Sequence, residues 1–155
     1  MRSKWAILIA ASVLAATAIA VSIVSVSAAG SGVTRLHVVE RVTNETVVDL
    51  TANGDSTGDL LTFHNDLYDA DNEVLIGSDQ GDCVRVEVGV SWECRWVNIL
   101  DNGSITVEGP FYDEGPSVLA ITGGTGDYRG AGGSMRLVPL SDGTGYDFIF
   151  RILTI

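Results

Sequence analysis

Beyond residue 30 the chain is a succession of short segments with β-strand character, and no stretch has the apolar spacing of an amphipathic helix. The segments are separated by turn signals such as Asn-Gly and Asp-Gly, which supply the positive φ angles of tight hairpins. Strands at this spacing indicate an antiparallel sandwich or barrel. We expect strands at 33–42, 45–51, 59–68, 73–79, 81–89, 91–100, 104–109, 117–122, 133–140 and 145–153.

The first residues have the features of a secretory signal peptide. Arg2 and Lys4 form a short positive region, residues 5–26 are almost wholly apolar, and residues 26–28 are small, as at a cleavage site. We therefore predict a secreted protein that has no contact with a membrane once the signal is cleaved. A membrane-anchored form is the alternative, because the apolar run reaches about the length of a spanning helix, roughly 20 residues.

The chain after this leader is strongly acidic. The full sequence has 9 basic residues, of which Arg2 and Lys4 lie in the leader. The remaining 7, against 20 acidic residues, give a formal charge of −13. Such a charge repels nucleic acid, so we expect none as a partner. No lysine remains for a Schiff base, and the two histidines, His37 and His64, lack the spacing of metal ligands. We therefore predict no metal site.

Residues 121–133, ITGGTGDYRGAGG, are rich in glycine. A dinucleotide loop is excluded because its spacing would need glycine in place of Arg129, and a P-loop is excluded because no G-K-[S/T] triplet occurs. No helix pattern follows that could hold an anion at its N-terminus. We interpret the segment as a structural loop between two strands, which Asp127, Tyr128 and Arg129 close.

The last hairpin can be put in register from the residue numbers. A tip at 142–143 places Leu137 opposite Phe148 and Met135 opposite Phe150, so that one face of the hairpin is continuously apolar.

A second hairpin, in the middle of the chain, brings the two cysteines together. Its register places Cys83 opposite Cys94 and Arg85 opposite Trp92, with Trp96 on the same face. In an exported chain two facing cysteines predict a disulfide. The alternative is a pair of reduced, buried thiols that act as small apolar side chains.

Four segments of the chain follow one another as in a known family. They are GDLLTFHNDLYD at 58–69, GSDQG at 77–81, ITVEG at 105–109 and the glycine-rich segment at 121–133. Together they resemble the allene oxide cyclase barrel superfamily, which includes the plant dirigent proteins. The Cys-Val-Arg and Trp-Glu-Cys elements around the two cysteines are similar to its secreted bacterial members. The resemblance covers roughly residues 58–153.

This resemblance implies an all-β fold: an antiparallel eight-stranded β-barrel of allene oxide cyclase or dirigent type with an apolar lumen, preceded here by an N-terminal signal helix. It also implies a homo-oligomer, a trimer or a dimer. The chain then divides into a signal peptide or membrane anchor at 1–28 and one domain at 29–155. Residues 29–57 supply N-terminal strands and a loop, and residues 58–155 form the core of the barrel.

The resemblance also implies a function. Plant members cyclise an unstable allene oxide or steer phenoxy-radical coupling, and neither reaction needs a metal or an organic cofactor. We predict an isomerase-like or cyclase-like barrel that binds a small, mostly apolar molecule and guides ring closure without a cofactor. The alternatives are a non-catalytic barrel that binds a small apolar ligand or steers coupling, and a purely structural secreted protein. The acid that dirigent proteins often carry before the glycine segment is absent at 117–119.

Asp66 and Arg85 are the predicted catalytic residues. Asp66 matches an acidic position of the family and could act as a base; alternatively, it is a strand-end carboxylate bonded to a turn. Arg85 could bind a substrate carboxylate or enolate; alternatively, it forms a cation–π pair that stabilises the sheet. Tyr112 and Glu114 are expected on a loop at one barrel mouth, with a solvated rim as the alternative. The predicted substrate-binding residues are Phe63, His64, Tyr68, Trp92, Trp96, Tyr112, Glu114 and Phe148.

Overall fold

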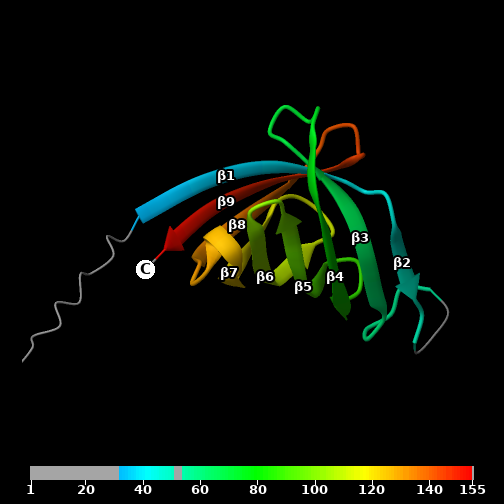
Figure 1. Cartoon of the computed structure of the whole chain (residues 1–155). Helices are drawn as coiled ribbons and strands as arrows, with labels where there is room; N and C mark the ends of the chain where they lie inside the picture. Colours follow the sequence, from blue (N-terminus) through cyan, green and yellow to red (C-terminus); the bar gives the residue numbers. More distant parts are fainter. Residues whose placement is uncertain (1–31, 51–53, 155) are drawn as a thin grey trace, which may run out of the picture.

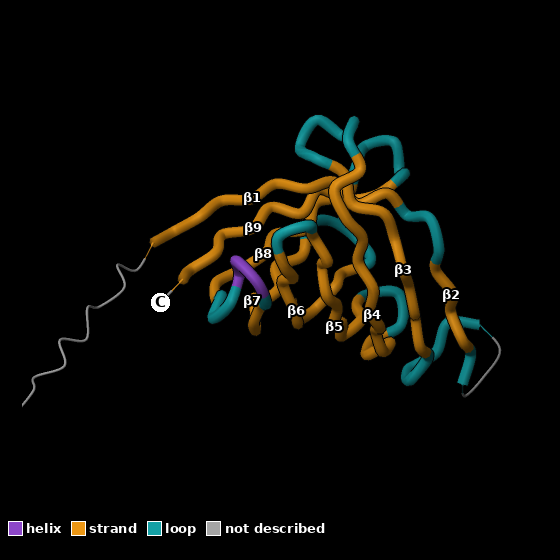
Figure 2. Tube along the Cα trace, viewed as in Figure 1, coloured by secondary structure: helices purple, strands orange, loops and turns teal. Residues whose placement is uncertain are grey.

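The computed structural model describes residues 32–50 and 54–154, and the predicted signal peptide or anchor at 1–28 lies outside the described residues. Strands account for most of the described chain, as the alternating pattern predicts (Figure 2). Within these two ranges the only helical element is a 3-10 turn of 3 residues. No helix of the described part has the length and apolar character needed to cross a membrane.

The elements of the described ranges follow one another as labelled in Figure 1. They are β1 (Gly32–Arg41), β2 (Glu45–Val48), β3 (Leu60–Tyr68), β4 (Leu75–Glu87), β5 (Ser91–Leu100), β6 (Gly103–Tyr112), β7 (Ser117–Gly124), η1 (Gly126–Tyr128), β8 (Gly132–Pro139) and β9 (Gly145–Thr154). All neighbouring strands pair antiparallel.

Eight of the described strands close into a barrel. Their order is β1-β9-β8-β7-β6-β5-β4-β3, and β1 completes the circle by pairing with β3. This closing contact is short, since residues 39–41 pair with 66–68. The ninth strand, β2, lies beside the first part of β3, at residues 60–63 (Figure 1). The expected eight-stranded antiparallel barrel is therefore confirmed, with one additional strand.

The link between β1 and β2 is held by a side chain from β3. Asn65 Oδ1 accepts hydrogen bonds from the backbone amides of Thr43, at 2.8 Å, and Asn44, at 3.0 Å. β2 then begins with Glu45 opposite Phe63. Because opposite residues of an antiparallel pair point to the same face, Glu45 and Phe63 face the same side of the sheet.

Both hairpin registers predicted from the residue numbers are confirmed. Leu137 pairs with Phe148, and Cys83 pairs with Cys94. The two cysteines form a disulfide, as their positions predict. The glycine-rich segment at 121–133 is a structural connection: β7 ends in it, η1 turns the chain, and β8 begins in it.

Several predicted strand boundaries differ from the structure, and two of the differences concern the candidate site. β4 runs without interruption through residues 80 and 81, where the sequence pattern predicts two separate strands, 73–79 and 81–89. A Cβ atom at Gly81 would lie 2.3 Å from Cβ of Trp96 on the next strand. The absence of a side chain at Gly81 allows Trp96 to pack closely against β4, and the glycine does not end the strand. β6 also continues past residue 109 to Tyr112, whose amide donates to Ser117 Oγ at 2.9 Å.

One end of the barrel is filled by apolar side chains. Phe150 and Ile152, from the second half of β9, are buried together with Ile105 of β6, Leu119 of β7 and Met135 of β8. Toward the other end, aromatic side chains surround a cavity.

Candidate small-molecule binding site

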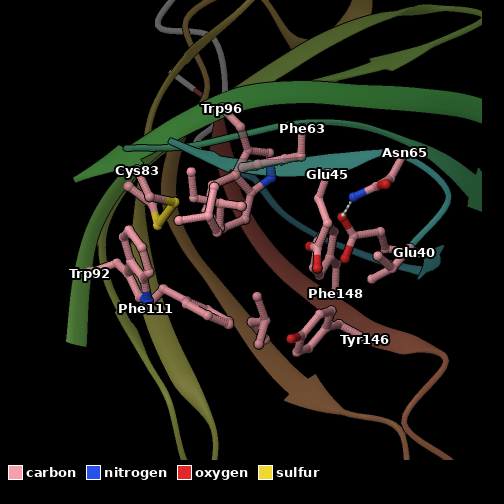
Figure 3. A pocket seen from close by; sticks show the side chains of 15 residues that line it. Glu40, Glu45, Phe63, Asn65, Cys83, Trp92, Trp96, Phe111, Tyr146 and Phe148 are labelled. Atoms are coloured by element: carbon pink, nitrogen blue, oxygen red, sulfur yellow. Dashed lines mark hydrogen bonds between the residues drawn. A yellow bond between two sulfur atoms is a disulfide. The ribbon is translucent and has the colours of Figure 1, made fainter. Parts of the chain in front are cut away.

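A partly open cavity of about 230 Å³ lies inside the barrel beside β2. Its described lining comes from β1 to β6, β8 and β9 and is mainly aromatic and aliphatic (Figure 3). The inward-facing positions of a barrel strand recur every second residue, which is why side chains from many strands converge on one space.

Trp96 stands at the centre of the aromatic wall. Its ring centroid lies 5.8 Å from that of Phe63 and 5.7 Å from that of Phe148. Across the cavity, the rings of Phe111 and Tyr146 meet edge to face with centroids 5.7 Å apart. Such contacts hold the rings in fixed positions, so the wall offers a rigid apolar surface.

A row of buried polar side chains crosses four neighbouring strands next to this wall. Glu40 is 4% exposed, and Asn65, Asp79 and Asn98 are 2% exposed or less. Asn65 is opposite Asp79, and Asp79 is opposite Asn98. Asn65 Nδ2 donates to Glu40 Oε1 at 2.8 Å (Figure 3), and the backbone N–H of Asn65 donates to Asp79 Oδ1 at 3.3 Å. Asn65 therefore connects the two acids to each other and to the β1–β2 link.

Glu40 and Asp79 form a carboxyl pair that holds a proton. Burial raises the pKa of Asp79 to about 9, and the charge of Glu40 beside it acts in the same direction. Burial also raises the pKa of Glu40, while hydrogen bonds from Asn65 and Asp79 oppose that rise. A hydrogen bond between two carboxyl groups requires a proton on one of them. Asp79 Oδ2 is buried and receives no hydrogen bond from the described residues, so a negative charge on it would be unpaired.

The electrostatic potential at the open side of the cavity is negative. Glu45 lines the cavity from β2, and Glu40 lines it from β1. Burial raises the pKa of Tyr146, and the charges of Glu40 and Glu45 raise it further. The phenol of Tyr146 therefore keeps its proton and can donate a hydrogen bond to a ligand.

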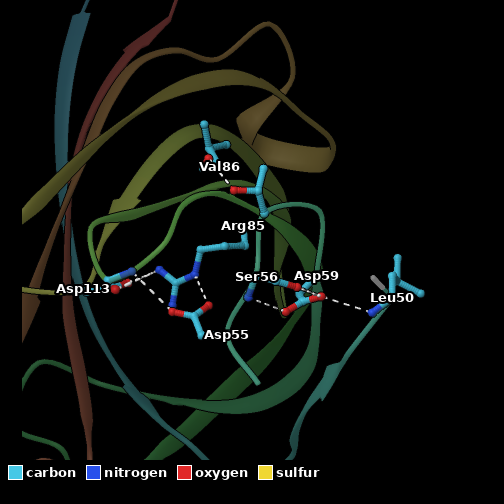
Figure 4. A network of polar contacts seen from close by, with 9 residues as sticks. Leu50, Asp55, Ser56, Asp59, Arg85, Val86 and Asp113 are labelled. Atoms are coloured by element: carbon cyan, nitrogen blue, oxygen red, sulfur yellow. Dashed lines mark hydrogen bonds and ion pairs between the residues drawn. The ribbon is translucent and has the colours of Figure 1, made fainter. Parts of the chain in front are cut away.

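Arg85 belongs to a separate polar network beside the cavity (Figure 4). Its Nε donates to Asp55 Oδ1 at 2.7 Å, and one terminal nitrogen donates to both oxygens of Asp113 at 2.6 and 2.8 Å. Its Cζ lies 4.0 Å from the centroid of the Trp92 ring. Arg85 is 7% exposed and its guanidinium is bound to the protein itself, so the cation–π alternative describes it better than a substrate contact.

Four of the predicted substrate-binding residues line the cavity. They are Phe63, Trp92, Trp96 and Phe148. The disulfide-bonded Cys83 and Cys94 also belong to the wall.

The other predicted site residues lie away from the cavity. Asp66, His64 and Tyr68 alternate along β3 with its inward-facing positions, which places them on the outer surface. Tyr112 and Glu114 are exposed and do not line the cavity. The structure brings neither predicted catalytic residue, Asp66 or Arg85, into the lining of the cavity.

Sequence reasoning overlooks Glu40, Asn65 and Asp79. A signal was present, because Asn65 is in phase with Phe63 on β3, and Asp79 is in phase with Cys83 on β4. A polar residue at such a position is buried among apolar ones and needs a partner. The predicted gap between the strands 73–79 and 81–89 separates Asp79 from that pattern.

The chemistry available at this site is acid–base chemistry on an apolar ligand. In residues 32–50 and 54–154, no group of three or more His, Cys, Asp or Glu side chains is arranged to hold a metal ion. The groups that can act on a ligand are the carboxyl of Glu40, the phenol of Tyr146 and the proton of Asp79 behind Glu40.

The family model described as the allene oxide cyclase barrel like domain matches residues 39–150. The chain belongs to this family. The match agrees with the resemblance found in the sequence and includes the closing strand pair, the aromatic wall and the carboxyl pair.

Solved structures with this barrel include proteins of several activities. The allene oxide cyclase-like chain is similar to a pyocyanin demethylase, with a TM-score of 0.66 and 22% identity over 76% of this chain and 100% of that one. It is similar to an exo-specific intermolecular Diels-Alderase, with a TM-score of 0.64 and 17% identity over 79% and 98%. A pterocarpan synthase dirigent protein gives a TM-score of 0.63 and 17% identity over 85% and 94%. At these identities the likeness shows a shared fold.

Proposed function

We propose that this chain is a secreted barrel that binds a small, mostly apolar substrate in its cavity and guides a ring closure or isomerisation. The observation that carries the proposal is the position of a proton-holding carboxyl pair at the edge of a rigid aromatic cavity. The walls restrict the conformations of a bound molecule. The pair supplies an acid and a base at one place.

Three members of the polar row have a role in this proposal. Glu40 lines the cavity and exchanges a proton with the substrate. Asp79 lies behind it and supplies or receives that proton. Asn65 positions Glu40 through its 2.8 Å hydrogen bond. Ring closure or isomerisation leaves the number of protons unchanged, so a pair that shares one proton returns to its starting state after each turnover.

The size of the cavity limits the substrate. Its volume of about 230 Å³ is below the roughly 300–1,000 Å³ typical of sites for drug-sized ligands. The substrate is therefore small, or part of it projects past β2 into solvent. The name of the similar Diels-Alderase refers to a ring-forming reaction, which supports the proposal by analogy of fold.

Fluorescence gives a direct test of binding. Outside the leader, which contains Trp5, the tryptophans of the chain are Trp92 and Trp96, and both line the cavity. A titration with a panel of small apolar compounds should therefore change the intrinsic emission when a compound enters the barrel. Compounds that bind are then incubated with the protein and analysed for isomeric products by chromatography and mass spectrometry.

A pair of variants separates catalysis from binding. Glu40→Gln keeps an acceptor for Asn65 but removes the ionisable group, so turnover should fall by about 10²–10⁴-fold with binding retained. Glu108→Gln, at an exposed position of β6, should change neither. If Glu40→Gln converts the substrate at the rate of the wild type, the acid–base role is refuted. If compounds bind but none is converted, the apolar lining favours the alternative function, a non-catalytic ligand carrier.

A further inference from the structure

We propose that the cavity selects substrates that carry a positive charge on an otherwise apolar skeleton, and that Glu45 and Glu40 set this preference. The inference rests on the function proposed above and adds the chemical class of the substrate to it. It follows from the charges of the side chains around the cavity and from the fact that the nearby arginines already have partners within the protein.

The ionisable side chains in the cavity wall are acids or phenols. Glu45 faces the cavity from β2, opposite Phe63, and Glu40 faces it from β1. None of the described lining residues is lysine, arginine or histidine. The charges of both acids raise the pKa of Tyr146, whose ring contacts that of Phe111.

The nearest arginines are already paired with groups of the protein. Arg85 is bound by Asp55 and Asp113, at 2.7 and 2.6 Å. Arg41 donates to Asn72 Oδ1 at 2.7 Å and lies 3.7 Å from the ring centroid of Tyr68 on the outer surface. A substrate carboxylate in the cavity would therefore lie near two like charges and gain no counter-ion, which is unfavourable.

A cation gains two contacts in the same place. Its charge is attracted by the carboxylates of Glu45 and Glu40, and the faces of the surrounding aromatic rings carry the negative part of their quadrupole. The apolar part of the molecule can pack against Trp96 and Phe148. The charged end then lies toward β2, where Glu45 and Val47 of the lining are exposed and solvent can reach it.

Three matched probes test this selection. The probes are 4-phenylbutylammonium, 4-phenylbutan-1-ol and 4-phenylbutanoate, which share one skeleton and differ in charge. Emission from Trp92 and Trp96 reports binding of each. We expect the ammonium to bind at least about tenfold more tightly than the carboxylate, with the alcohol between them. Raising the salt concentration to about 1 M should reduce the difference, because exposed charges are screened.

Two variants show whether the preference for the ammonium probe comes from the cavity or from the overall charge of the protein. Glu45→Gln and Glu108→Gln remove the same charge, but Glu45 lines the cavity and Glu108 is exposed on β6. Circular dichroism confirms that each is folded. Glu45→Gln should reduce the preference by about threefold or more, and Glu40→Gln should reduce it further.

The outcomes separate this inference from the proposed function. If the three probes bind wild-type protein equally, or if Glu108→Gln lowers the preference as much as Glu45→Gln does, charge selection by the cavity is overturned while apolar binding stands. If no probe binds at any concentration, the proposed function fails together with this inference.

Discussion

Replacing Asp79 with asparagine should stabilise the protein in neutral and alkaline solution and have less benefit in acid. Asparagine has nearly the shape of a protonated aspartic acid, and its amide can donate to Glu40 as the acid does. Asp79 must keep its proton to remain buried, since its pKa in the folded protein is about 9 and its ordinary value is 3.8. Asparagine has no proton to lose.

The sign and size of the effect follow from proton binding. Between pH 3.8 and about 9, the folded wild-type protein holds a proton at Asp79 that the unfolded chain has released. The free energy of unfolding of the wild type therefore falls as the pH rises, by up to about 1.4 kcal/mol per pH unit for one proton. Below this window both states hold the proton, and above it neither does. The free energy of unfolding of Asp79→Asn should lack this fall with pH. The stability of the variant relative to wild type should therefore increase by up to ~3 kcal/mol from pH 5 to pH 7.

The assay is urea unfolding followed by the emission of Trp92 and Trp96 at pH 5, 6, 7 and 8. Asp82→Asn is the matched control, because Asp82 lies on the same strand with a half-exposed side chain, 3.5 Å from Arg95. The control should show no such dependence. A difference between Asp79→Asn and wild type that stays constant within about 0.5 kcal/mol from pH 5 to pH 8 would refute a protonated Asp79.

Two further predictions concern stability. Gly81→Ala should destabilise the barrel by about 1–3 kcal/mol, since the new Cβ would meet the backbone and Cβ of Trp96; Gly123→Ala, where nothing lies within 4 Å, is the control. Equal melting temperatures for the two variants would show that the strands separate at no cost. Arg85→Gln should lower the free energy of unfolding by about 1–3 kcal/mol, because it leaves two partly buried carboxylates without their counter-ion. Arg95→Gln breaks an exposed ion pair and should lower it by about 0.5 kcal/mol or less. Chemical denaturation of both variants measures this contrast, and similar losses would mean that Arg85 is not a structural residue.

The similar structures with this barrel have names that refer to different activities, and a shared fold does not by itself determine a function. In this chain the acids Glu40 and Asp79 are placed by β1 and β4, which meet across β3.

Local properties of the sequence determined the strands, the turns and two of the strand registers. The pairs Cys83–Cys94 and Leu137–Phe148 could be predicted because a short turn leaves one way to align the two strands of a hairpin. The disulfide follows from the same register. The aromatic wall could be predicted in part, since large apolar side chains such as Trp96 are buried wherever a barrel has an interior.

Only the tertiary structure decided which face of each strand is the interior. A period of two defines two faces of β3, with Asn65 on one and Asp66 on the other, and both faces carry polar and apolar residues. Closure of the sheet by β1 turned the Asn65 face inward and brought Glu40 beside Asp79. Contacts of this kind join residues that are far apart in the chain. The free energy of these contacts depends on burial in the closed barrel, and a local sequence pattern does not predict that burial.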